Sequence, residues 1–180
     1  MPARRKRSLF AKHTATAVSS RTPAQLARPE EYNRFVSAIE LRFLRLAHCE
    51  IDARARYDGN QLSPVVTEGN VQYVGHDDGF IVYHELIFDA KPTSGKGSHA
   101  SVRATFEVEY ASPTPVTDEL FAVFRANNLP VNVWPFFREF VNTALGRAAW
   151  PPYLLPTLKV SPAGRPQRQR VGKTHSASGE

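Results

Sequence analysis

The sequence has very little sulfur: its 180 residues contain one cysteine, Cys49, and one methionine. A single cysteine excludes an intramolecular disulfide and a thiolate metal site, and it is typical of a reducing compartment, so we expect a cytoplasmic protein. None of the six histidines has the spacing of a metal motif such as HExxH; they are at positions 13, 48, 76, 84, 99 and 175. We therefore expect no metal ion and no other cofactor.

Long hydrophobic runs are also missing, so we expect no membrane insertion. The basic cluster at residues 4–7 resembles the start of a secretory or twin-arginine signal, but residues 8–20 contain no apolar core of the necessary length. An organelle transit peptide is also rich in arginine and free of acidic residues, so it stays an alternative for this end of the chain.

Signatures of catalysis are absent as well, because the sequence has neither a G-x-S-x-G elbow nor a dinucleotide-binding glycine turn. Residues 172–174, Gly-Lys-Thr, imitate the end of a phosphate loop without its first glycine. His84 and Glu85 are consecutive on a predicted strand and point to opposite faces. Arg138 and Glu139 lie about 100° apart on a predicted helix, so each is expected to pair with a neighbouring element or subunit. We expect no catalytic residues and no enzyme, and a small-molecule enzyme is the third hypothesis.

The net charge of +6 is unevenly distributed along the chain. Residues 1–28 contain seven Lys or Arg and no acidic residue, and residues 161–180 contain four against one. Residues 29–160 contain twelve basic and sixteen acidic residues, so this part is mildly acidic. We expect one folded domain over 29–160 between two basic, disordered tails, 1–28 and 161–180.

Hydrophobic periodicity predicts an α+β domain, in which strands come before the main helices. Helices are expected over about 29–37, 118–127 and 133–147, and strands over 38–55, around 71–75, 80–88 and 100–110. In the first strand, the apolar phase slips between Phe43 and Leu44, which indicates a β-bulge or a strand covered on both faces. The last strand alternates cleanly, with Arg103, Glu107 and Glu109 on its polar side.

The most aromatic part of the chain is residues 129–159. Its predicted helix has an apolar arc of roughly 180°, wider than the ~100° stripe that covers a single core. Asn132 is a possible helix cap and Pro135 fits a first helical turn. The segment 150–156 is apolar but contains three prolines, so it is expected to cover another part of the protein as a flap.

The motifs in this region resemble the carboxy-terminal signature of the SecB-like chaperones. They are the aromatic-proline run at residues 134–139, the Gly-Arg pair at 146–147 and the Pro/Leu segment at 152–156. The resemblance covers about 126–159. It implies a four-stranded antiparallel sheet with the C-terminal helices packed on one face. It also implies a homotetramer, built as a dimer of dimers, that holds unfolded polypeptides in apolar grooves.

The resemblance places the long helix at the interface between dimers and the grooves beside the flap and the first strand. The expected oligomer-interface residues are Phe136, Phe140, Val141 and Ala144. The expected client-binding residues are Phe43, Leu44, Leu46, Trp134, Phe137, Trp150, Tyr153 and Leu154. We expect residues 150–155 to form the movable lip of the groove.

The function that follows is an ATP-independent holdase, which binds unfolded or nascent chains reversibly. The family resemblance implies two roles: delivery of preproteins to the translocase ATPase SecA, and protection of the antitoxin of a toxin-antitoxin pair. The alternative from a different class is an RNA-binding protein that acts through its arginine-rich tails.

Overall fold

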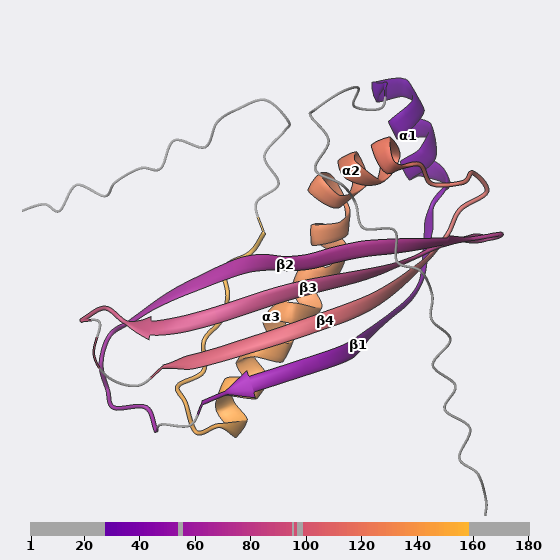
Figure 1. The fold of residues 1–180 in the computed structure, drawn as a ribbon. Helices are drawn as coiled ribbons and strands as arrows, with labels where there is room; N and C mark the ends of the chain where they lie inside the picture. The colour runs from indigo at the N-terminus through magenta and orange to yellow at the C-terminus, as the bar shows by residue number, and fades with distance from the viewer. Residues whose placement is uncertain (1–27, 54–55, 95, 97–98, 159–180) are drawn as a thin grey trace, which may run out of the picture.

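The computed structural model describes residues 28–53, 56–94, 96 and 99–158. Both predicted tails, apart from Arg28, lie outside these residues. Within them the elements are helix α1 (Pro29–Ala38), strands β1 (Glu40–Asp52), β2 (Leu62–His76), β3 (Gly79–Pro92) and β4 (Ala100–Ala111), and helices α2 (Asp118–Asn127) and α3 (Leu129–Arg147). The strands form one antiparallel sheet in the order β1-β4-β3-β2, so the predicted α+β fold class is confirmed (Figure 1).

The helices lie on one face of the sheet, and no described helix lies on the other face (Figure 1). On β3 and β4 every second side chain is buried against the helices, whereas the alternate ones are partly exposed. We call these two sides the helix face and the open face. The clean alternation predicted for the last strand is therefore confirmed, with Arg103, Glu107 and Glu109 on the open face.

Strand β1 contains a β-bulge, as predicted, but at a different position: the register shifts lie between Leu41 and Phe43 and between Leu46 and His48, not between Phe43 and Leu44. Directly opposite residues of an antiparallel pair lie on the same face. Leu41, Leu44 and Leu46 are opposite the helix-face residues Tyr110, Val108 and Phe106. Phe43 is opposite Glu109 and therefore lies on the open face. The first bulge thus keeps Leu41 on the same face as Leu44 and Leu46, and the second keeps Ile51, opposite Val102, on that face too.

Strand β2 is longer than the sequence predicted, because it begins at Leu62 and is interrupted rather than ended near Gly69. A register shift between Glu68 and Val71 leaves the Asn70 amide free to donate to Glu85 Oε2 at 3.0 Å. A Cβ atom on Gly69 would lie 1.9 Å from the same oxygen, so a larger residue there would displace the Glu85 carboxylate. The hydrogen bond from Asn70, with help from Arg103, lowers the pKa of Glu85.

Helices α1 and α2 begin as the sequence predicted. Pro29 occupies the first turn of α1, and the Thr117 hydroxyl accepts the Leu120 amide at 3.3 Å to cap α2. Phe35 of α1 packs on Phe80, with ring centroids 6.1 Å apart, and closes one end of the core. This aromatic contact fixes α1 against the end of the sheet and α2.

Helix α3 begins at Leu129 rather than Val133, so two predicted details are wrong. Pro135 lies inside the helix and not in its first turn, which holds Pro130 instead. Asn132 does not cap the helix; its Nδ2 donates to the Tyr110 hydroxyl at 2.9 Å. Within the described ranges, no helix combines the length and the apolar character that a membrane crossing requires.

Candidate functional site

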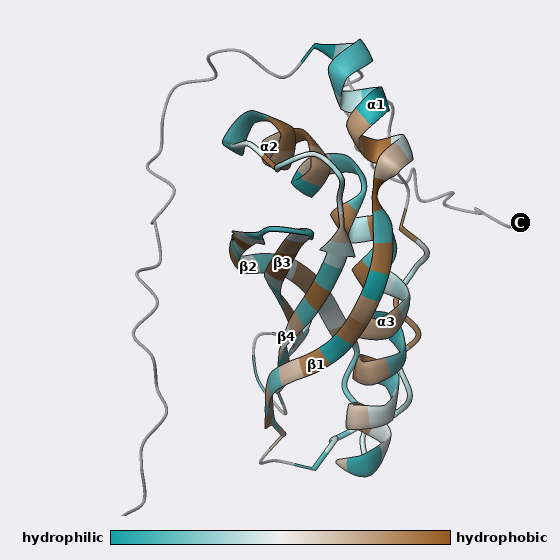
Figure 2. Ribbon diagram, turned by 90° about the vertical axis from the view of Figure 1, so that its right-hand side faces the viewer, coloured by the Kyte–Doolittle hydropathy of each residue, from teal (hydrophilic) through white to brown (hydrophobic). Residues whose placement is uncertain are grey.

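The edge strand β1 carries an unusual number of exposed apolar side chains. On its helix face the exposed fractions are 46% for Leu41, 37% for Leu46 and 47% for Ile51, and Leu44 is half-buried. We call Leu41, Leu44, Leu46 and Ile51 the β1 strip; the apolar positions recur along β1 in Figure 2. Because β1 pairs with β4 alone in the described chain, its outer backbone groups are open to another strand.

The open face of β1 has a different character, because ion pairs tie it to β4. Arg45 lies 2.6 Å from Glu107, and Arg42 lies 4.0 Å from Glu109. Phe43, with 46% of its side chain exposed, is the apolar exception on this side. An apolar segment therefore has its larger contact area on the β1 strip, with Phe43 available on the opposite side of the strand.

Helix α3 divides the predicted site residues between its two sides. Val133, Phe137, Val141 and Leu145 recur every four residues and are buried against the sheet, together with Ala144. Phe137, predicted to contact clients, and Val141 and Ala144, predicted at the oligomer interface, therefore lie in the core of the single chain. Phe136 remains 48% exposed, and Phe140 is half-buried. The helical period decides this division, because residues 136 and 137 point about 100° apart.

Residues 150–158 form a segment that we call the C-terminal strap, which passes behind β2 and β3 in Figure 1. Trp150 and Leu155 are 3% and 1% exposed. Tyr153 packs on Phe88 with ring centroids 5.6 Å apart, and Trp134 Nε1 donates to the Pro156 carbonyl at 2.9 Å. The segment predicted to be a flap is thus packed against the sheet and α3 in the single chain.

Leu154 is the exception in the strap, with 65% of its side chain exposed. The strap covers the β2–β3 half of the helix face, whereas β1 is the opposite edge of the sheet. The predicted client-binding residues therefore fall into an exposed group on β1 and a largely buried group on α3 and the strap. One chain does not bring all of them into a single open groove.

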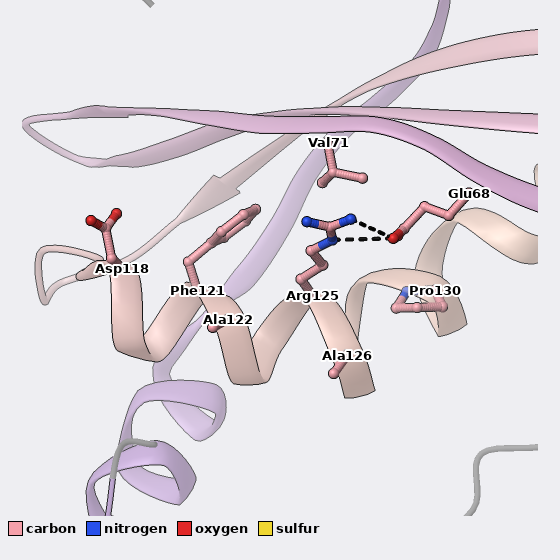
Figure 3. Close-up of a pocket in the computed structure, with 8 residues that line it drawn as sticks. All are labelled: Glu68, Val71, Asp118, Phe121, Ala122, Arg125, Ala126 and Pro130. Carbon is pink, nitrogen blue, oxygen red and sulfur yellow. Dashed lines mark hydrogen bonds and ion pairs between the residues drawn. The ribbon is translucent and has the colours of Figure 1, made fainter. Parts of the chain in front are cut away.

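A second feature, absent from the sequence analysis, is a cavity of about 520 Å³ between β2 and α2 (Figure 3). We call it the β2–α2 pocket, and its lining consists of Glu68, Val71, Asp118, Phe121, Ala122, Arg125, Ala126 and Pro130. Arg125 donates to Glu68 Oε2 from Nε at 3.2 Å and from one terminal nitrogen at 2.6 Å. The other terminal nitrogen points away from Glu68, toward the space beside Phe121 and Val71 (Figure 3).

His84 lies beside this pocket and is 1% exposed, with Nε2 3.0 Å from Glu68 Oε1. Burial lowers the pKa of His84, and the nearby Glu68 carboxylate opposes part of this effect. Glu85 faces the other side of the sheet, where Arg103 Nη1 donates to it at 3.0 Å. The sequence neighbours 84 and 85 therefore form no acid/base pair, as strand geometry predicted.

The neighbouring pair Arg138 and Glu139 is also separated. Glu139 accepts the Thr143 hydroxyl at 2.8 Å within its own helix. The Arg138 Nε atom is buried and has no hydrogen-bond partner among the described residues. In the same part of the chain, no group of three His, Cys, Asp or Glu side chains is placed to hold a metal ion.

Comparison with known proteins gives structural matches only. No family model matches the sequence, and no curated protein matches it. The fold is similar to the SecB-like chaperone of Mycobacterium tuberculosis, solved in complex with a ChAD peptide from the HigA1 antitoxin. The TM-score is 0.60 at 19% identity, over 73% of this chain and 95% of that one. The chain therefore has the SecB-like chaperone fold, as the motifs at 134–139 and 152–156 predicted.

Proposed function

We propose that the protein is an ATP-independent holdase that binds unfolded segments of other polypeptides. The observation that carries this proposal is the combination of a SecB-like fold with the exposed apolar β1 strip on an unpaired strand edge. Binding removes unfolded chains from the free pool, so aggregation slows without any nucleotide.

The β1 strip offers a client two kinds of contact. Its leucine and isoleucine side chains exclude water from an apolar segment, and the backbone of β1 pairs with an extended chain by strand addition. Phe43 and Leu154 add exposed apolar area at two other points. Phe137 and Trp150 are buried in the single chain, so neither is part of this exposed surface.

The assembly that we propose is a homotetramer, built as a dimer of dimers through the outward side of α3. Phe136 and Val131 are 48% and 47% exposed there, and Phe140 is half-buried. Several client surfaces on one assembly would raise the overall affinity through effective concentration.

Among clients, an antitoxin is favoured over a preprotein. The structurally similar chaperone was solved with an antitoxin peptide. Delivery to SecA would use an acidic open face, but Glu107 and Glu109 each lie beside an arginine of β1, at 2.6 and 4.0 Å. These arginines offset the negative charge that such docking would require. The RNA-binding alternative rests on the basic tails and gains no support from the described residues.

Suppression of aggregation of an unfolded protein tests the proposal. Leu41→Ser combined with Leu46→Ser should raise the concentration for half-maximal suppression several-fold. The matched control is Val65→Ser combined with Val74→Ser on β2, because these valines are 53% and 51% exposed on the open face at the other edge. Equal suppression by both double variants and by the unchanged protein would remove the β1 strip as the client surface.

A further inference from the structure

The β2–α2 pocket has the volume of a ligand site and no role in the holdase proposal. Its 520 Å³ falls in the usual range for binding pockets. The floor is apolar, because its lining includes Val71, Phe121, Ala122 and Ala126. Val71 and Phe121 are 9% and 5% exposed. An apolar side chain would be a suitable occupant.

The rim of the pocket has an excess of negative charge. Its charged groups are Glu68, Asp118 and Arg125, which is two carboxylates and one guanidinium. Arg125 is already engaged with Glu68, and Asp118 uses Oδ1 to accept the Tyr73 hydroxyl at 2.7 Å. The third nitrogen of the Arg125 guanidinium points into the space beside Phe121 (Figure 3), where a carbonyl oxygen of an occupant would accept a hydrogen bond from it. The preferred occupant is therefore an apolar peptide segment flanked by positive charge.

The chain itself contains such a segment. Residues 1–27 hold six Lys or Arg and no acidic residue, whereas residues 29–160 hold an excess of acidic residues. Phe10 is the only Phe, Tyr or Trp among residues 1–27, and with Leu9 it forms an apolar pair between Arg7 and Lys12. The charge and the side chains of this segment are thus complementary to those of the pocket.

The covalent connection is long enough for the segment to reach the pocket. Residues 11–27 span up to about 55 Å when extended, at about 3.3 Å per residue. They join α1, whose Tyr32 hydroxyl donates to Asn128 at the junction of α2 and α3. Helix α2, which forms one wall of the pocket, is only about 15 Å long at 1.5 Å per residue.

We propose that the β2–α2 pocket is an intramolecular docking site for Leu9 and Phe10, with Arg7 and Lys12 beside the carboxylates of the rim. Tethering raises the effective concentration of the segment to the millimolar range, so a modest intrinsic affinity is enough to fill the pocket. This proposal concerns a surface other than the β1 strip and does not depend on the chaperone function.

Photo-crosslinking of the full chain tests the docking directly. Phe10→p-benzoylphenylalanine should crosslink to peptides that contain Val71 or Phe121, and the same residue in place of Val18 should give these crosslinks at least several-fold less often. Mixing unlabelled and ¹⁵N-labelled protein distinguishes links within a chain from links between chains. Crosslinks only between chains, only to other regions, or equal in both variants would overturn the intramolecular proposal.

Hydrogen exchange of the full chain gives a second measurement that is independent of the crosslinking chemistry. Leu9→Ala combined with Phe10→Ala should increase the exchange rates of amides in residues 68–73 and 118–126 several-fold, whereas Val18→Ala should not. Unchanged exchange in the double variant would count against docking even if the protein suppresses aggregation normally. If the unchanged protein shows the expected crosslinks and exchange protection but does not suppress aggregation, the docking proposal stands and the holdase proposal is contradicted.

Discussion

Trp134 Nε1 donates a hydrogen bond to the carbonyl oxygen of Pro156 at 2.9 Å, and this bond joins helix α3 to the C-terminal strap. The two residues belong to the two motifs that carry the SecB-like resemblance, the aromatic-proline run and the Pro/Leu segment. The bond therefore explains the spacing of these motifs. The strap returns along α3, and the C-terminal end of the strap is joined to the first half of that helix.

Trp134→Phe should loosen the end of the strap and leave the rest of the fold intact. The variant keeps an aromatic ring but loses the indole donor, and a hydrogen bond of this kind contributes about 0.5–1.5 kcal/mol to the free energy of unfolding. Limited proteolysis should cleave between residues 154 and 158 several-fold faster than in the unchanged protein. Phe136→Leu is a suitable control on the same helix, and equal cleavage of all three proteins would show that the bond does not hold the strap.

Trp150 and Leu154 should respond very differently to truncation, although both were expected to line the client groove. Trp150 is 3% exposed and packs on Tyr57, so Trp150→Ala should lower the free energy of unfolding by about 3–5 kcal/mol. Leu154 is 65% exposed, so Leu154→Ala should leave the unfolding free energy within about 0.5 kcal/mol. Urea titration measures both values, and a similar loss in the two variants would contradict the packing of the strap.

The contrast between these two residues shows what the sequence could predict and what it could not. Alternation located β3 and β4, and the motifs at 134–139 and 152–156 predicted the fold. Pro64 and Gly69 interrupt the pattern of β2, so its first half was missed. Periodicity identifies an apolar arc, but it does not say which part meets the chain's own sheet, and Phe136 and Phe137 therefore could not be separated.

Partners across the sheet were equally inaccessible to sequence reasoning. Glu68 meets His84 because the β2 bulge sets the register between β2 and β3, and Arg125 reaches the same carboxylate from α2. Neither distance along the chain nor residue type marks these three side chains as a group. Only the folded register brings them together.

Stability should fall as the pH is lowered below about 6.5, because burial lowers the pKa of His84 from its value of 6.5 in the unfolded chain. In this window the unfolded state binds more protons than the folded state, so the free energy of unfolding rises with pH and is lost on acidification. His84→Gln should reduce the difference between urea titrations at pH 7.5 and 5.5. Glu85 also has a lowered pKa, but its effect appears below about 4.5. An unchanged pH difference in the variant would show that His84 does not cause it.

Phe136→Glu should dissociate the proposed assembly without unfolding the subunit. The side chain is 48% exposed in the single chain, so a charge there is hydrated in the monomer but would be costly when buried against a second copy. Light scattering should change from about four times the 20.1 kDa chain mass to a smaller species, with an unchanged circular dichroism spectrum. Val74→Glu, on the open face of β2, is the control and should keep the assembly. If Phe136→Glu keeps the full mass, the outward side of α3 is not the interface; if the unchanged protein is itself a monomer, the tetramer is excluded.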